Sequence, residues 1–167
     1  FKKTTFATLF ILSIGVLSAQ QSEINTNNSS AFNHAVKLYN NKAYAAAQKT
    51  FKEVALNSDN SSTLKSDSEY YNAICAVKLN QKEADKMVLN FVENYPNSNK
   101  KEKAFLDIGN YYFSNKKVAY ALKWYGKVNP NILSIDNQYE LNFKMGYALL
   151  TTGNLNFANK KFLPLIN

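Results

Sequence analysis

The chain has 167 residues and a single cysteine, so an internal disulfide is excluded and the stability of a folded core must come from packing. Its formal net charge is +8, and every basic residue is a lysine. Because bidentate recognition of phosphates and bases usually depends on arginine, this composition argues against nucleic acid as a partner.

The first residues are typical of a secretory signal peptide. Lys2 and Lys3 precede an apolar run over residues 6–17, and the small residues Ser18 and Ala19 precede a polar segment. The run is shorter than the roughly 20 residues that a membrane-spanning helix needs. We therefore predict a signal peptide helix over residues 1–19 that is cleaved on export, with retention as a membrane anchor as the alternative.

The next segment, residues 20–30, is too polar to bury, so we predict a flexible leader there. The remaining residues, 31–167, are enough for one compact domain with a sizeable core. No convincing alternation of polar and apolar residues predicts a strand in this part, and we expect an all-α fold.

From residue 31 onward the chain repeats itself: Ala47, Ala84, Ala121 and Ala158 stand 37 residues apart. A period of roughly 20 to 50 residues is the signature of a repeat array. In each copy, apolar residues follow the alanine four and seven positions later, which places them on one face of an amphipathic helix, and a lysine two positions later points away. The aligned apolar residues are Phe51, Val88, Tyr125 and Phe162, then Val54, Phe91, Val128 and Leu165; the lysines are Lys49, Lys86, Lys123 and Lys160.

A second helix is predicted before each of these, and a short polar turn separates the two. Small residues where the helices cross would let the backbones approach closely. In the second copy Ala73 suits the small position better than Asn72, which predicts a one-residue shift in that turn. Each copy is thus a helix hairpin that buries its apolar face by stacking on its neighbours. The apolar positions are Leu38, Cys75, Tyr112 and Leu149, the small positions Ala35, Asn72, Gly109 and Gly146, and the copies span residues 31–59, 67–96, 102–130 and 137–167.

The third copy reads Phe105-Leu106-Asp107-Ile108-Gly109-Asn110-Tyr111-Tyr112, then Val118, Ala121, Tyr125 and Val128. This resembles the pattern of tetratricopeptide repeats, whose usual period is about 34 residues. The repeat interval of 37 here is three residues longer than that period. We expect the additional residues in the links between hairpins, at Ser58 to Ser66 and Asn129 to Asp136. The resemblance covers about residues 30 to 166 and implies a right-handed α-solenoid of about four helix hairpins. With the signal peptide and the arginine-free, asparagine-rich composition, the chain is similar to exported or periplasmic tetratricopeptide proteins of Bacteroidota-type bacteria.

The resemblance implies a binding function. In that family the first helices of successive hairpins line a concave groove, and rings together with side-chain amides suit the capture of an extended peptide. For an exported chain, we expect a protein or peptide ligand from the periplasm or cell envelope of a Gram-negative bacterium, in the setting of envelope or outer-membrane assembly. By the resemblance, the groove positions are Phe32, Val36, Tyr39, Asn40, Tyr70, Ile74, Val77, Lys78, Leu106, Asn110, Phe113, Phe143, Tyr147 and Thr151.

Candidate catalytic and metal-binding residues are sparse. His34 is the only histidine, and we expect a structural role for it on the first helix. Cys75 falls in an apolar column of the repeat and is expected in the core, without the base that would activate a thiol. The sequence contains no cluster of metal ligands and no phosphate-binding glycine pattern. We therefore predict a protein without catalytic residues, cofactor or metal.

Other possibilities stay open at this point. The chain could be a module that binds peptidoglycan or another glycan through aromatic residues, or the N-terminal arm of a longer enzyme. The repeated lysines could form a solvated face or a ridge for an acidic partner. Membrane association is expected only through a partner or an uncleaved signal segment. The apolar end, Phe162 to Asn167, predicts either repeats beyond residue 167 or a docked partner.

Overall fold

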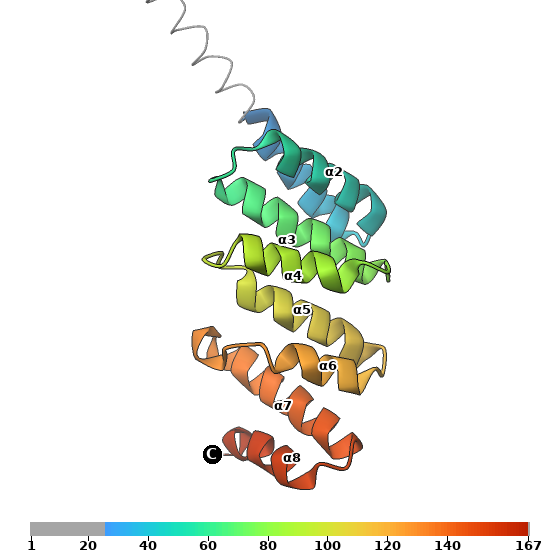
Figure 1. Ribbon diagram of the computed structural model, residues 1–167, viewed down its shortest axis with the longest axis vertical. Helices are drawn as coiled ribbons and strands as arrows, with labels where there is room; N and C mark the ends of the chain where they lie inside the picture. Colours follow the sequence, from blue (N-terminus) through green and yellow to red (C-terminus); the bar gives the residue numbers. More distant parts are fainter. Residues whose placement is uncertain (1–25, 167) are drawn as a thin grey trace, which may run out of the picture.

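The structure, a computed structural model, describes residues 26–166. The predicted signal peptide, residues 1–19, lies outside this part of the chain. Within residues 26–166 the protein is all-helical and contains no strand, as the sequence predicts (Figure 1). The first helix covers residues 26–40 of the described chain, and it is followed by α2 (Tyr44–Asn57), α3 (Thr63–Lys78), α4 (Ala84–Asn94), α5 (Lys101–Ser114), α6 (Val118–Tyr125), the 3-10 turn η1 (Pro130–Ile132), α7 (Ile135–Thr151), α8 (Leu155–Phe162) and the 3-10 turn η2 (Leu163–Leu165).

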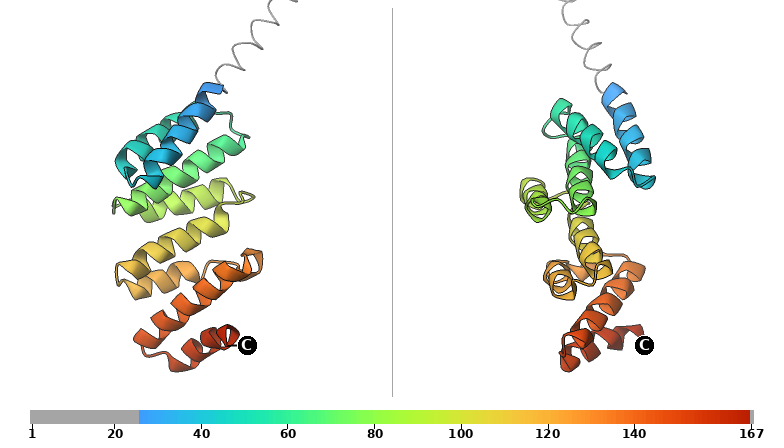
Figure 2. Two further views of the ribbon diagram at one scale, coloured as in Figure 1. Left: turned by 180° about the vertical axis from the view of Figure 1, so that it is seen from behind. Right: turned by 90° about the vertical axis from the view of Figure 1, so that its right-hand side faces the viewer.

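The helices follow one another along the long axis of the molecule (Figure 1). Consecutive helices pair as hairpins, and α3 also packs on α2 and α5, while α5 packs on α7. The four hairpin turns lie at one edge, and the links between hairpins lie at the opposite edge. Figure 2 shows α4 and α6 on one side of the layer that contains α3 and α5. Contacts between hairpins are made mainly by the second helix of one pair and the first helix of the next, and the first helices also touch one another.

The four hairpin turns have the same backbone design. Each contains one residue with a left-handed backbone conformation, and the N–H of this residue donates to the carbonyl three residues back, while the next N–H donates to the carbonyl five residues before it. This is the Schellman motif that ends many helices. The left-handed residues are Lys42 (φ 62°), Asn80 (φ 53°), Lys116 (φ 60°) and Gly153 (φ 81°).

The turns confirm the predicted one-residue shift in the second hairpin. Asn80 stands seven residues after Ala73, the same separation that links Lys116 to Gly109 and Gly153 to Gly146. Ala73 is buried and therefore occupies the small position of this hairpin. The compensating residue is lost before the repeat alanine: Ala84 stands four residues after Asn80, whereas the other repeat alanines stand five residues after their left-handed residue. In addition, α4 begins at Ala84 itself, whereas α2, α6 and α8 each begin three residues before their repeat alanine.

The repeat columns form the core. All four repeat alanines are buried, as are Phe51, Val88 and Tyr125, while Phe162 is half-buried. The glycines allow the predicted close approach: a Cβ added to Gly109 would lie 2.5 Å from the ring of Tyr125, and one added to Gly146 would lie 2.5 Å from the ring of Phe162. The lysine column is exposed on the opposite face, as predicted; its members are Lys49, Lys86, Lys123 and Lys160.

The first helix begins earlier than the sequence predicts. Residues 26–30, assigned above to a flexible leader, are helical. Asn28 is buried, and its Nδ2 donates to the carbonyl oxygen of Asn57 at the end of α2 (2.8 Å). The Asn28 amide therefore joins this polar turn of helix to α2, a contact that composition alone does not reveal.

Candidate functional site

A groove of about 420 Å³ lies between α5 and α7, on the face formed by the first helices of the hairpins. One wall is α5 and the other is the first part of α7, and the link through η1 closes one end. Eight of the twelve lining residues are polar and four are apolar, so the groove is more polar than the usual site for a small molecule. The lining residues are Asn99, Glu102, Lys103, Leu106, Asp107, Asn110, Ile132, Leu133, Ser134, Asn137, Glu140 and Leu141.

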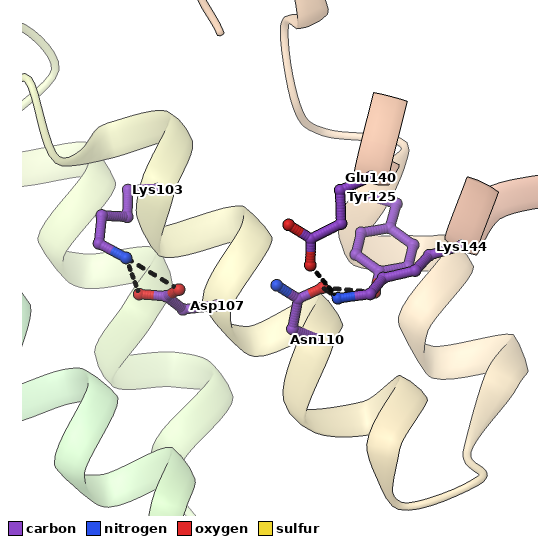
Figure 3. Close-up of polar contacts among 6 residues, drawn as sticks. All are labelled: Lys103, Asp107, Asn110, Tyr125, Glu140 and Lys144. Atoms are coloured by element: carbon purple, nitrogen blue, oxygen red, sulfur yellow. Dashed lines mark hydrogen bonds and ion pairs between the residues drawn. The ribbon is translucent and has the colours of Figure 1, made fainter. Parts of the chain in front are cut away.

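Asp107 fixes the α5 wall of the groove (Figure 3). Lys103 lies one helical turn earlier, and its Nζ donates to both carboxylate oxygens at 3.1 Å. The Tyr70 hydroxyl donates to the same carboxylate from α3. Burial raises the pKa of Tyr70, and the charge of Asp107 raises it further, so this phenol remains a hydrogen-bond donor at neutral pH. The pairing therefore ties the second hairpin to the third.

Asn110 joins α5 to both α6 and α7 (Figure 3). Its Oδ1 accepts from the Tyr125 hydroxyl at 2.7 Å and from Lys144 Nζ at 3.0 Å. Lys144 is in turn paired with Glu140 on the same helix. Burial raises the pKa of Tyr125, with a smaller contribution from the charge of Glu140. One amide oxygen thus sets the positions of three helices around the groove.

Three carboxylates line the groove, those of Glu102, Asp107 and Glu140. Lys103 pairs with Asp107 and Lys144 pairs with Glu140, which leaves Glu102 without a lysine partner among the described residues. Glu102 accepts from the backbone N–H of Asn129 at 2.7 Å, which orients its carboxylate at the link between the hairpins. Among the described residues, the side-chain amides of Asn99 and Asn137 have no hydrogen-bond partner, so they are free to bind a ligand.

The structure corrects part of the predicted groove. Tyr70, Ile74 and Val77 are only 1%, 0% and 2% exposed, because this face of α3 is covered by α5 and contributes to the core. They cannot line an open groove. Two of the predicted positions on α5, Leu106 and Asn110, do line the groove between α5 and α7.

The other predicted positions do not converge on one site. Three on the first helix, Phe32, Val36 and Tyr39, are half-buried against the core. Phe113 contacts the exposed ring of Tyr147, with 5.7 Å between ring centroids. The remaining four lie apart from the α5–α7 groove: Asn40, Phe143 and Thr151 are exposed, and Lys78 is half-buried.

Five charged residues of the site were missed from the sequence. One is Glu102, and the other four form two pairs: Lys103 with Asp107, and Glu140 with Lys144. A signal for them exists. Each pair has an opposite charge at spacing i, i+4, and the two pairs are one repeat interval apart with the signs reversed. Because the two pairs occupy equivalent positions of adjacent first helices, the sequence could have predicted that both lie near the space between these helices.

The two residues considered as catalytic candidates in the sequence have different surroundings. His34 is exposed, and Cys75 is completely buried in the core as predicted. Burial raises the pKa of the Cys75 thiol to about 12, which disfavours the reactive thiolate. Residues 26–166 contain no group of three His, Cys, Asp or Glu side chains placed to hold a metal ion.

Comparison of the chain with protein-family models and with curated proteins gives no match. Within residues 26–166, no helix combines the length and the apolar character that crossing a bilayer requires.

Proposed function

We propose that this chain is an exported, non-catalytic scaffold of the tetratricopeptide type, a right-handed α-solenoid that binds a segment of another protein in the α5–α7 groove. The repeated turn design and the repeated columns of buried alanine and small residues support the repeat assignment. The sequence pattern of the third hairpin supports the family, and the N-terminal sequence supports export.

The α5–α7 groove is the observation that carries the binding function. Leu106, Leu133 and Leu141 offer apolar area for ligand side chains, and the amides of Asn99 and Asn137 offer hydrogen bonds to an extended backbone. The walls are held by side-chain hydrogen bonds before any ligand arrives, so little ordering would oppose binding. The carboxylate of Glu102, which has no lysine partner among the described residues, favours a segment that carries lysine or arginine.

A blocking substitution tests this proposal. In Asn137→Arg a long side chain would occupy the groove and remove a free amide, while the backbone N–H that contacts Ser134 remains. Asn156→Arg, at an exposed position of α8 away from the groove, is the matched control. We expect a ligand recovered from envelope extract, then purified and titrated calorimetrically, to lose at least tenfold in affinity for Asn137→Arg alone. Equal affinity for both variants would place binding elsewhere.

The envelope location rests on the N-terminal sequence and has its own test. Expression of the whole chain in a Gram-negative host should give a periplasmic product whose first residue is Gln20. A product that keeps residues 1–19 and sediments with membranes would support retention of the segment as an anchor.

A second cleft supports glycan binding as the alternative function. It also measures about 420 Å³, lies between the link at residues 60–63 and the end of α4, and has no charged residue in its lining. Hydroxyl and amide groups beside the ring of Tyr95 suit the hydrogen bonding and stacking of a neutral sugar. Its lining residues are Asn60, Ser61, Ser62, Thr63, Ser66, Asn94, Tyr95, Pro96, Asn97, Ser98 and Asn99.

Co-sedimentation with purified peptidoglycan distinguishes the two functions. If the cleft binds glycan, Asn97→Ala, at an exposed position, should release the chain from the pellet, and Asn137→Arg should not. If neither variant nor the unmodified chain sediments, the glycan function is wrong and the protein-binding groove is unaffected.

A further inference from the structure

Large hydrophobic side chains are exposed mainly on the last hairpin. Five of them define what we call the α7 stripe: Ile135 (56% exposed), Tyr139 (44%), Phe143 (54%), Tyr147 (47%) and Leu150 (47%). Their spacing of four, four, four and three residues puts them on one face of the helix. A contiguous apolar surface of this kind on a folded chain marks an interaction site more often than chance exposure.

The same face is covered on α3, and on α5 it is contacted in part by α7. One repeat interval before the α7 stripe, α5 carries Leu106, Asn110 and Phe113. Asn110 is bound by Lys144 of α7, and the ring of Phe113 contacts Tyr147 of α7. One hairpin earlier, and allowing for the one-residue shift, the equivalent face of α3 is buried under α5. The α7 stripe therefore corresponds to the face on which a following helix packs in the earlier hairpins. No described residue covers it on α7.

We propose that the α7 stripe is a self-association face, on which a second copy of the chain packs tail to tail through its own α7 stripe. The opposite end of the molecule offers no match, because the exposed side chains of the first helix include Asn33, His34 and Lys37. Head-to-tail packing would set these polar groups against the stripe. Two stripes related by a twofold axis are complementary to each other, which is the usual form of a homodimer interface.

Charge favours the same arrangement. The chain carries a formal net charge of +8, so contact between most pairs of surfaces would bring lysines together. The α7 stripe contains no charged residue. The single lysine of α7, Lys144, is directed toward α5, where Asn110 binds it, and is also paired with Glu140 of its own helix. The α7 stripe thus lets two copies meet without opposing lysines.

The exposed area fits a weak but specific dimer. Half-exposed aromatic side chains each retain on the order of 100 Å² of accessible surface. With Ile135 and Leu150, the α7 stripe offers on the order of 500 Å² per copy, or about 1,000 Å² for the pair, near the lower limit of specific interfaces. We expect a dissociation constant in the range of about 1 to about 100 μM.

Sedimentation velocity of the 167-residue chain tests the proposal. Between about 1 and about 200 μM the chain should pass from monomer to dimer and no further. Phe143→Glu and Tyr139→Glu should each weaken dimerisation at least tenfold, because they bury a carboxylate at the interface. The matched control is Leu56→Glu, since Leu56 is 72% exposed on α2 and lies outside the stripe. The apolar run at residues 6–17 is common to all these proteins and cannot cause a difference between them.

Circular dichroism and thermal unfolding establish that each variant remains folded, as expected for exposed positions. A chain that stays monomeric throughout the range would overturn the proposal and assign the α7 stripe to a different protein. A mass that keeps rising beyond the dimer would indicate head-to-tail assembly and would overturn it too. Equal dimerisation by Phe143→Glu and Leu56→Glu would place the contact on another surface. None of these outcomes depends on ligand binding in the α5–α7 groove.

Discussion

The ring of Tyr125 occupies the space where a side chain of Gly109 would be. A Cβ at Gly109 would lie 2.5 Å from Cε1 and 2.6 Å from Cδ1 of Tyr125. The phenol is also held at its other end, by its hydrogen bond to Asn110 one residue further along α5. The glycine and the asparagine together therefore fix how α6 lies on α5, and α5 is one wall of the proposed binding groove.

We predict that Gly109→Ala lowers the free energy of unfolding by about 1 to 3 kcal/mol, because the buried ring must move and gives up its hydrogen bond. Urea denaturation measures this change. Gly146→Ala should cost less, since the ring it displaces, Phe162, is only half-buried. The second hairpin has valine at the position that corresponds to Tyr125. In a Tyr125→Val background the ring is absent, so the penalty of Gly109→Ala should largely disappear. A penalty that is unchanged in this background would mean that the ring is not its cause.

The left-handed turn residues offer a stabilising change. Lys116 has φ 60°, a conformation that costs a non-glycine residue about 1–2 kcal/mol. Lys116→Gly should raise the free energy of unfolding by about 0.5–1 kcal/mol, after allowing for the greater flexibility of glycine in the unfolded chain. Lys116→Ala is the matched control and should give no increase, because it removes the lysine side chain and keeps the backbone cost. Gly153→Ala should destabilise the fourth turn in chemical denaturation. A gain of stability in Lys116→Ala would attribute the effect to lost charge repulsion instead.

The link between Asn110 and Tyr125 can be measured by a double-mutant cycle. Asn110→Ala removes the acceptor of the phenol and of Lys144, and Tyr125→Phe removes the donor. We expect each change to destabilise the protein and the coupling energy to be about 1 kcal/mol. Asn115→Ala serves as the control, because Asn115 bonds only to the carbonyl of Tyr111 at the exposed end of α5. The destabilisation by Asn115→Ala should be additive with that of Tyr125→Phe. A coupling energy near zero between Asn110 and Tyr125 as well would contradict the proposed link between these two residues.

The buried thiol predicts a specific dependence on alkaline pH. Burial raises the pKa of Cys75 from 9.0 to about 12, so the unfolded chain loses this proton before the folded chain does. The thiol's contribution to stability is fully present below about pH 9 and is lost as the pH rises toward 12, at up to about 1.4 kcal/mol per pH unit. Stability of the unmodified chain should therefore fall more steeply than that of Cys75→Ala.

Urea midpoints at a series of pH values give the comparison. The two curves should converge as the pH rises, while the buried tyrosines, present in both proteins, contribute equally to each. Parallel curves would show that the folded state does not hold the thiol in its neutral form. At neutral pH, Ellman's reagent should react with Cys75 only after unfolding in urea.

Much of the fold follows from local periodicity. The columns that begin at Ala47 and Phe51 predict the buried side of every second helix, and Ala73 predicts the shift that the turn at Asn80 confirms. Periodicity is informative here because the positions that touch within a hairpin are close in sequence. The polar start of the first helix was predicted incorrectly, since it is tied down by the Asn28 amide, a contact across two helices.

The register of the groove was harder to predict for a physical reason. The same face of each first helix packs on the next first helix or lines a groove, depending on how the two cross. Along α3 that face is closed by α5, so Ile74 is buried, whereas α5 and α7 leave space and Leu106 lines a groove. The angle at which two first helices cross depends on contacts between hairpins. The repeated spacing of residues within one sequence does not reveal these contacts.

The two edges of the molecule differ in how much variation they allow. At one edge all four hairpins close with the same hydrogen-bonded turn, whereas the links at the other edge, over residues 58–62, 95–100 and 126–134, differ in length and shape. Insertions should therefore be tolerated at the second edge, where no common geometry has to be preserved. An epitope tag or a fluorescent reporter placed in one of these links would leave the stacking of the helices intact.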